Sequence, residues 1–90
     1  MYKKGCTMAN TWKTRFSEEI DTKWRKIEFS GFGILEVSHN DIRYVLGGEK
    51  PTDEIVGAVV KSGKTHEFFN QTVWLRASEH KVLVTIHDQV

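Results

Sequence analysis

The feature that most constrains the fold is a succession of short β-type segments, which fills the chain from Phe29 to its C-terminal end. In the last of these segments, Val82, Val84 and Ile86 alternate with residues of mixed polarity. Successive side chains of a strand point to opposite faces, so this period predicts a half-buried strand. Several such strands at close spacing predict an all-β protein, either a small antiparallel β-sandwich or a jelly-roll-like barrel.

Turn residues separate the expected strands. Glycine adopts positive φ without strain, asparagine tolerates it, and proline removes a backbone donor from the sheet. The expected strands cover residues 23–29, 33–38, 41–46, 55–61, 65–69, 72–77 and 81–87. The separators are His39-Asn40, residues 47–51, Ser62-Gly63, which we expect to form a hairpin turn, and Ser78-Glu79-His80.

The N-terminal part of the chain, up to about Trp24, fits two kinds of local structure. Trp12, Phe16, Ile20 and Trp24 recur at four-residue spacing, which is typical of one face of a helix. The residues around Trp24, however, alternate in the manner of a strand. Residues 12–21 are therefore expected to form either a strand or a single helical turn.

The same segment suggests a division of the chain. Its residues are polar and weakly patterned, so we expect residues 1–21 to form a flexible N-terminal arm. Residues 22–90 would then form a single β-sandwich domain. Met8 is an alternative start of translation to Met1.

Length, charge and cysteine content exclude several classes of protein. A chain of 90 residues closes one modest core. Its formal net charge of +1 gives no strong attraction to nucleic acid or to an anionic membrane. The single Cys6 cannot form an intrachain disulfide, which fits a reducing compartment. We also expect no transmembrane helix and no signal peptide, because the chain has no long apolar stretch.

No pattern in the chain predicts a catalytic, cofactor or metal site. Residues 57–65 resemble a phosphate-binding loop, but five residues separate the two glycines where that loop has four. A strand-like run follows where a helix is needed. The histidines His39, His66, His80 and His87 lack the spacing of zinc or iron ligands. We therefore expect a protein that is not an enzyme.

Aromatic side chains give the clearest indication of function. They make up 11% of the chain, which is more than a small sandwich buries completely. Trp74 and Arg76 share one face of their strand, and both residue types are enriched at binding hot spots. Alternatively, Trp74 is an anchor of the core. Tyr2, Trp12 and Phe16 are further candidates for partner binding, since an arm that carries them would order on contact with a partner.

The strands also follow a recognisable layout. The residues that carry it are Trp24-x-x-Ile27, Gly31-x-Gly33-Ile34-x-Glu36-Val37-Ser38, Tyr44-Val45-x-Gly47-x-x-x-Pro51, Ser62-Gly63-Lys64, Val73-Trp74-Leu75-Arg76-Ala77 and Val82-x-Val84-x-Ile86. Over residues 22–88 this layout resembles small β-rich virion proteins of tailed bacteriophages, which decorate heads or build fibres and tail accessories. In such proteins the module has no active site.

The resemblance implies a function and a set of positions. Trp24, Tyr44 and Trp74 would occupy the aromatic strand positions, and Gly47 and Pro51 would lie in the loop after the middle strand. The protein would be a structural component of a virion, assembled in the host cytoplasm, whose partners are phage capsid or tail proteins.

Self-association is expected as well. Residues 81–87 have charges only at their ends, so an edge strand there would need another copy or a neighbour's arm to cover it. A homo-oligomer is therefore expected, and a trimer would fit the symmetry of many phage attachments.

An alternative function is carbohydrate binding. A module of this kind presents an exposed aromatic platform beside polar groups, for attachment to a host glycan. Trp74 with Arg76, or Tyr44 with Arg43, would supply such a platform.

Overall fold

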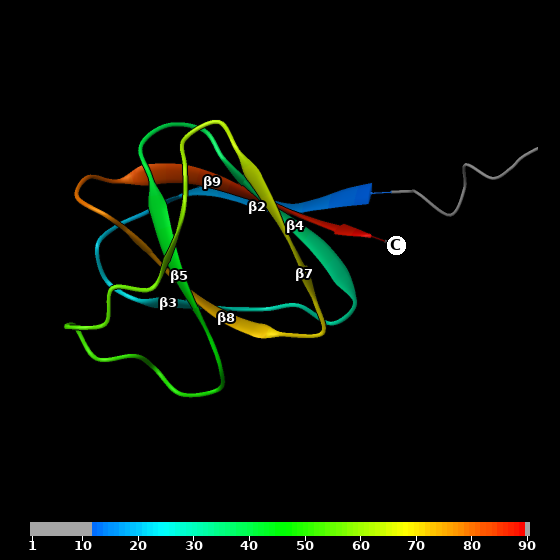
Figure 1. Cartoon of the computed structure of the whole chain (residues 1–90). Helices are drawn as coiled ribbons and strands as arrows, with labels where there is room; N and C mark the ends of the chain where they lie inside the picture. Colours follow the sequence, from blue (N-terminus) through cyan, green and yellow to red (C-terminus); the bar gives the residue numbers. More distant parts are fainter. Residues whose placement is uncertain (1–11, 90) are drawn as a thin grey trace, which may run out of the picture.

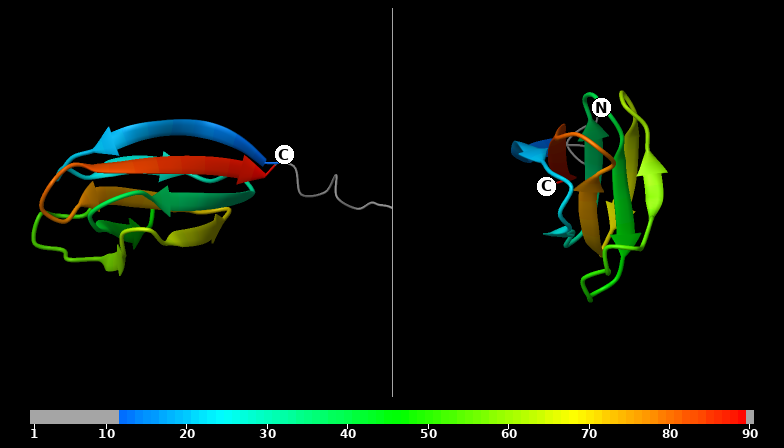
Figure 2. Two further views of the ribbon diagram at one scale, coloured as in Figure 1. Left: turned by 90° about the horizontal axis from the view of Figure 1, so that it is seen from above. Right: turned by 90° about the vertical axis from the view of Figure 1, so that its left-hand side faces the viewer.

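Two four-stranded antiparallel sheets pack face to face in a sandwich (Figure 1, Figure 2). The computed structural model describes residues 12–89. The first sheet has the order β2-β9-β4-β7 and contains β2 (Trp12–Ile20), β9 (Val82–Gln89), β4 (Phe32–Val37) and β7 (Thr65–Phe69). The second has the order β3-β8-β5-β6 and contains β3 (Arg25–Glu28), β8 (Thr72–Ala77), β5 (Ile42–Leu46) and β6 (Ala58–Val60). The predicted all-β sandwich is confirmed, and the described residues contain no helix.

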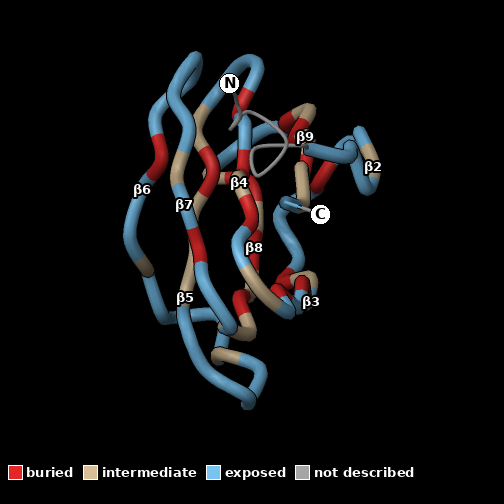
Figure 3. The backbone as a smooth tube through the Cα atoms, turned by 90° about the vertical axis from the view of Figure 1, so that its right-hand side faces the viewer, coloured by how far each residue is buried: buried red, intermediate tan, exposed pale blue. Residues whose placement is uncertain are grey.

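The core lies between the two sheets and follows the alternation of the sequence. Buried residues alternate with half-buried or exposed ones along β4, β8 and β9 (Figure 3). Burial of apolar area stabilises a fold by about 25 cal/mol per Å², so this interior holds the sheets together. Its members are Ile20, Ile27, Phe29, Leu35, Val37, Ile42, Val60, Phe68, Val73, Leu75, Ala77, Val82, Val84 and Ile86.

The predicted strands from residue 23 onward all form, with boundaries shifted by a few residues. Asn40, Gly47 and Gly63 have positive φ, as their turns require. The Ser62-Gly63 turn differs from the prediction, because β6 and β7 belong to different sheets. It carries the chain across the sandwich and is not a hairpin.

The prediction of a flexible N-terminal arm over residues 1–21 is wrong for residues 12–20. Trp12–Ile20 forms β2, which pairs with β9 along its whole length and shifts register between Thr14 and Phe16. Ile20 is 1% exposed in the core, and Phe16 packs against the core. Burial of these side chains makes the segment an integral strand of the sandwich. Residues 1–11, which include Tyr2, lie outside the described part of the chain.

The expectation that residues 81–87 form an edge strand is also wrong. β9 lies between β2 and β4 inside its sheet, because β2 supplies the hydrogen bonds that its outer side needs. The edges of the sandwich are β2 and β7 in one sheet and β3 and β6 in the other. On β2, the register shift at Thr14/Phe16 and several charged side chains oppose pairing with another chain.

Candidate functional site

Three aromatic side chains cross the outer face of the β2-β9-β4-β7 sheet in one row. Phe32 lies opposite Phe69 in the β4–β7 pairing, and Trp12 lies opposite Gln89 in the β2–β9 pairing. The β4–β9 pairing begins at Gly33 and Asp88, the residues next to Phe32 and Gln89 in the sequence. All four residues alternate with inward-facing neighbours, so they project away from the core. We call Trp12, Phe32 and Phe69 the aromatic row.

The rings of the aromatic row contact one another and solvent. The centroids of Trp12 and Phe32 are 6.4 Å apart with an interplanar angle of 86°, and those of Phe32 and Phe69 are 5.9 Å apart at 55°. Their exposed fractions are 38% for Trp12, 37% for Phe32 and 58% for Phe69. The row lies at the end of the sheet where β2 begins and β9 ends (Figure 1). The three rings therefore form one exposed aromatic group on paired strands, with Gln89 of β9 between Trp12 and Phe32 in the strand order.

A polar group borders the aromatic row. His87 Nε2 lies 3.0 Å from a Glu36 carboxylate oxygen, and His87 Nδ1 lies 3.0 Å from the Thr14 hydroxyl oxygen. With the proton on Nε2, the imidazole donates a hydrogen bond to Glu36 and accepts one at Nδ1 from the Thr14 hydroxyl. These contacts orient the ring on the sheet face beside Ile34, its neighbour on β4.

Trp74 and Arg76 do share a strand face, as predicted, but both are engaged within the molecule. The Trp74 indole N–H donates to the Gly47 carbonyl over 3.1 Å. Arg76 Nη2 donates to the carbonyls of Asp53 at 3.0 Å and Ile55 at 2.8 Å. The guanidinium also lies 4.4 Å from the centroid of the Trp24 ring. These side chains hold the β5–β6 loop against the outer face of their sheet.

The other predicted aromatic residues separate in space. Phe16 faces the core, and the Arg25 guanidinium lies 5.0 Å from the centroid of its ring. Tyr44 also packs against the core, with its hydroxyl oxygen 3.3 Å from His66 Nε2. Of the predicted candidates that the structure describes, Trp12 is therefore the one that joins an exposed aromatic cluster. Sequence reasoning missed its partners Phe32 and Phe69.

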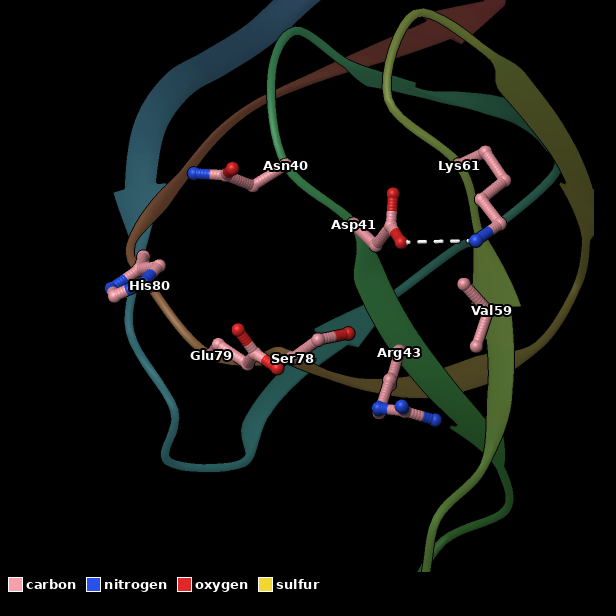
Figure 4. Close-up of a pocket in the computed structure, with 8 residues that line it drawn as sticks. All are labelled: Asn40, Asp41, Arg43, Val59, Lys61, Ser78, Glu79 and His80. Carbon is pink, nitrogen blue, oxygen red and sulfur yellow. Dashed lines mark hydrogen bonds and ion pairs between the residues drawn. The ribbon is translucent and has the colours of Figure 1, made fainter.

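A shallow polar pocket lies at one end of the sandwich, with a volume of about 310 Å³ (Figure 4). Asp41 is central to it and accepts hydrogen bonds from the Ser62 backbone N–H and from Lys61 Nζ. These bonds lower the pKa of the Asp41 carboxyl, the backbone bond most strongly. The Ser78 hydroxyl is buried there without a partner among the described residues.

The histidines do not assemble a metal site. Within residues 12–89, no three His, Cys, Asp or Glu side chains gather as metal ligands would. His66 lies on the inner side of its sheet beside the rings of Tyr44 and Phe68, whereas His87 projects from the outer side of the same sheet. No helix within residues 12–89 is long and apolar enough to cross a membrane.

Comparison with known proteins found no matching family model, no matching curated protein and no matching solved structure. The chemistry of the surface is therefore the basis for an assignment of function, and the aromatic row is its most distinctive feature.

Proposed function

We propose that this chain is a non-enzymatic structural protein of a phage particle, which docks on a capsid or tail protein through the aromatic row. The observation that carries the proposal is the exposure of three contacting aromatic rings on one sheet face. The virion assignment itself comes from the resemblance of the strand layout.

Aromatic rings suit this role energetically. Large aromatic side chains dominate the binding energy of protein interfaces, and truncation of one at a hot spot costs about 2 kcal/mol or more, roughly thirtyfold in Kd. Here the rings sit on hydrogen-bonded strands, so little backbone conformational entropy is lost when a partner covers them. Trp74 is less suited, because its N–H already donates to Gly47.

Repetition on a symmetric particle would amplify a modest contact. When several copies or arms engage together, each later contact forms at high effective concentration, and overall avidity exceeds the affinity of one site. A surface of three aromatic residues is small for a stable complex on its own. It is sufficient where several copies are joined in one oligomer and engage the particle together.

The test is binding of the purified full chain to phage particles that lack it. Wild type is expected to saturate the particles at a fixed copy number. Phe32→Ala and Phe69→Ala are each expected to weaken binding by tenfold or more. The loss of their cross-strand contact should lower the free energy of unfolding by about 1 kcal/mol or less, so both variants remain folded in the assay. The matched controls Leu46→Ala and Val56→Ala remove exposed apolar side chains elsewhere, at 48% and 61% exposure, and should bind like wild type. Equal losses in all four variants would contradict the proposal.

The carbohydrate alternative also has a specific observation in its favour: the row places aromatic rings beside the polar group of Thr14, His87 and Glu36. The ring planes differ by 86° and 55°, however, so they form no flat platform for an extended glycan. Saturable quenching of Trp12 fluorescence by host polysaccharide would favour this function. Titration of a Trp12→Phe variant separates that signal from Trp24 and Trp74.

A further inference from the structure

The sheet face that carries the aromatic row has a strongly asymmetric charge. The chain has 13 Lys and Arg and 12 Asp and Glu, yet no lysine or arginine occupies an outward position on its four described strands. Those positions, assigned by alternation from the buried residues, are Trp12, Thr14, Ser17 and Glu19 on β2, Leu83, Thr85, His87 and Gln89 on β9, Phe32, Ile34 and Glu36 on β4, and Thr65, Glu67 and Phe69 on β7.

The two cations of β2 are on the other side of that strand. Arg15 turns toward the sandwich and donates to both carboxylate oxygens of Asp88, over 2.9 and 2.8 Å. Lys13 lies opposite Asp88 in the β2–β9 register. Because it stands between Trp12 and Thr14, which face outward, it belongs to the other side of the strand. Among the described strand positions, the outer face therefore carries three carboxylates, and His87 is the one basic side chain there.

One of these carboxylates is well placed to act with the aromatic row. Glu67 lies two residues before Phe69 on the same face of β7, about 7 Å along the strand. In the register it is opposite Ile34, next to the pair of Phe32 and Phe69. Glu67 forms no ion pair within the described residues, whereas Glu36 is engaged by His87. An exposed carboxylate thus stands beside exposed aromatic rings.

Arginine is the side chain that matches this combination. Its planar guanidinium stacks on an aromatic ring and forms paired hydrogen bonds to a carboxylate. The sandwich uses the same arrangement twice internally. Arg15 binds Asp88 and lies 5.2 Å from the Phe29 centroid, and Arg25 binds Glu18 and lies over the ring of Phe16.

We propose that the occupant of this face is an arginine-bearing segment of a partner protein, with a guanidinium held between the Glu67 carboxylate and the rings of Phe32 and Phe69. The proposal rests on the proposed function, since it names the chemistry of the partner that docks on the aromatic row. The same negative charge disfavours nucleic acid and anionic lipid on this face.

A short labelled peptide of alternating arginine and serine is the probe, with matched peptides in which citrulline or lysine replaces arginine. Binding to the full chain is measured by fluorescence anisotropy at low ionic strength. We expect the arginine peptide to bind at least tenfold more tightly than the uncharged citrulline peptide, and several-fold more tightly than the lysine peptide. Equal binding of the lysine peptide would overturn the assignment to arginine.

Variants localise the contact. Glu67→Gln and Phe69→Ala are each expected to weaken binding of the arginine peptide threefold or more. The control Glu49→Gln removes an exposed carboxylate of the β5–β6 loop and should leave binding unchanged. An equal loss in Glu49→Gln would show non-specific attraction to surface carboxylates, and no loss in Glu67→Gln would show that this carboxylate does not contact the peptide. Either result would overturn the proposal.

The particle assay separates this proposal from the one on which it rests. If Phe32→Ala abolishes binding to particles while the arginine peptide fails to bind wild type, the docking surface stands and the partner chemistry is wrong. If Phe32→Ala binds particles normally, the proposed function fails, whatever the peptides do.

Discussion

Replacement of Gly33 by alanine should destabilise the sandwich through one identifiable contact. Gly33 lies on β4, and the ring of Phe29 occupies the space that a Cβ would take, with its Cδ1 and Cε1 in closest contact. The carbonyl oxygen of His87 lies 3.3 Å from the same position on the other side. Gly33 has no positive φ, so the cost is steric and does not come from backbone strain.

The magnitude follows from what Phe29 would lose. The ring is 4% exposed, stacks on Phe68 with centroids 5.1 Å apart, and lies under the Arg15 guanidinium. Added atoms in a packed core cost about 1–3 kcal/mol, and complete loss of a buried phenylalanine costs about 3–5 kcal/mol. We expect Gly33→Ala to lower the free energy of unfolding by about 2–3 kcal/mol. For a domain of this size that corresponds to about 10–20 °C in Tm.

Urea unfolding followed by tryptophan fluorescence measures this change. The control is Gly48→Ala, where an added Cβ meets nothing within 4 Å, and it should stay within about 0.5 kcal/mol of wild type. A double-mutant cycle with Phe29→Val isolates the contact, because the cost of Gly33→Ala should largely disappear once the ring is gone. An undiminished cost in the Phe29→Val background, or a neutral Gly33→Ala, would refute the reasoning.

Three further outcomes are expected. The hydrogen bonds from Arg15 lower the pKa of Asp88 in the folded state, so the pair stabilises the fold above the unfolded pKa of about 4 and this contribution is lost as pH falls through the folded value. Asp88→Asn should therefore unfold at a lower urea concentration than wild type at pH 7. Its free energy of unfolding should also fall less on acidification. Parallel plots of the free energy of unfolding against pH for the two proteins would count against this. Ile20→Ala should cost about 2–4 kcal/mol in urea unfolding, whereas a flexible arm predicts no change. Arg76→Lys should weaken the hydrogen bonds to the Asp53 and Ile55 carbonyls, which hold the β5–β6 loop. Amide hydrogen exchange should therefore become faster in this loop and stay unchanged in β9.

Most of the fold was predictable because its strands keep a strict two-residue alternation. Val82, Val84 and Ile86 all face the core, and the positive φ values of Asn40 and Gly63 fall where turn residues were recognised. In such segments the local pattern and the tertiary environment agree, so sequence reasoning succeeds.

The strand β2 was ambiguous for a physical reason. Its register shift between Thr14 and Phe16 changes which residues face inward. Trp12 therefore projects outward while Phe16 and Ile20 face the core. The resulting spacing in the sequence imitates a helical face, and the pairing with β9 decides between the two structures.

The aromatic row was not predictable, because it is a property of register between distant strands. Phe32 and Phe69 are far apart in sequence and become neighbours through the β4–β7 pairing. A local signal was present in Phe68-Phe69, since adjacent strand residues face opposite sides and one of them must point away from the core. Conversely, the roles of Trp74 and Arg76 depend on a loop whose path no local pattern specifies.

The most direct measurement of the central claim is photo-cross-linking from the aromatic row to the particle. Benzoyl-phenylalanine in place of Phe69 should cross-link to one virion protein upon illumination, and the same group in place of Val56, which is 61% exposed on the β5–β6 loop, should not. Mass spectrometry would identify the linked peptide and show whether it carries arginine. A specific cross-link from position 56 with none from position 69 would contradict the account.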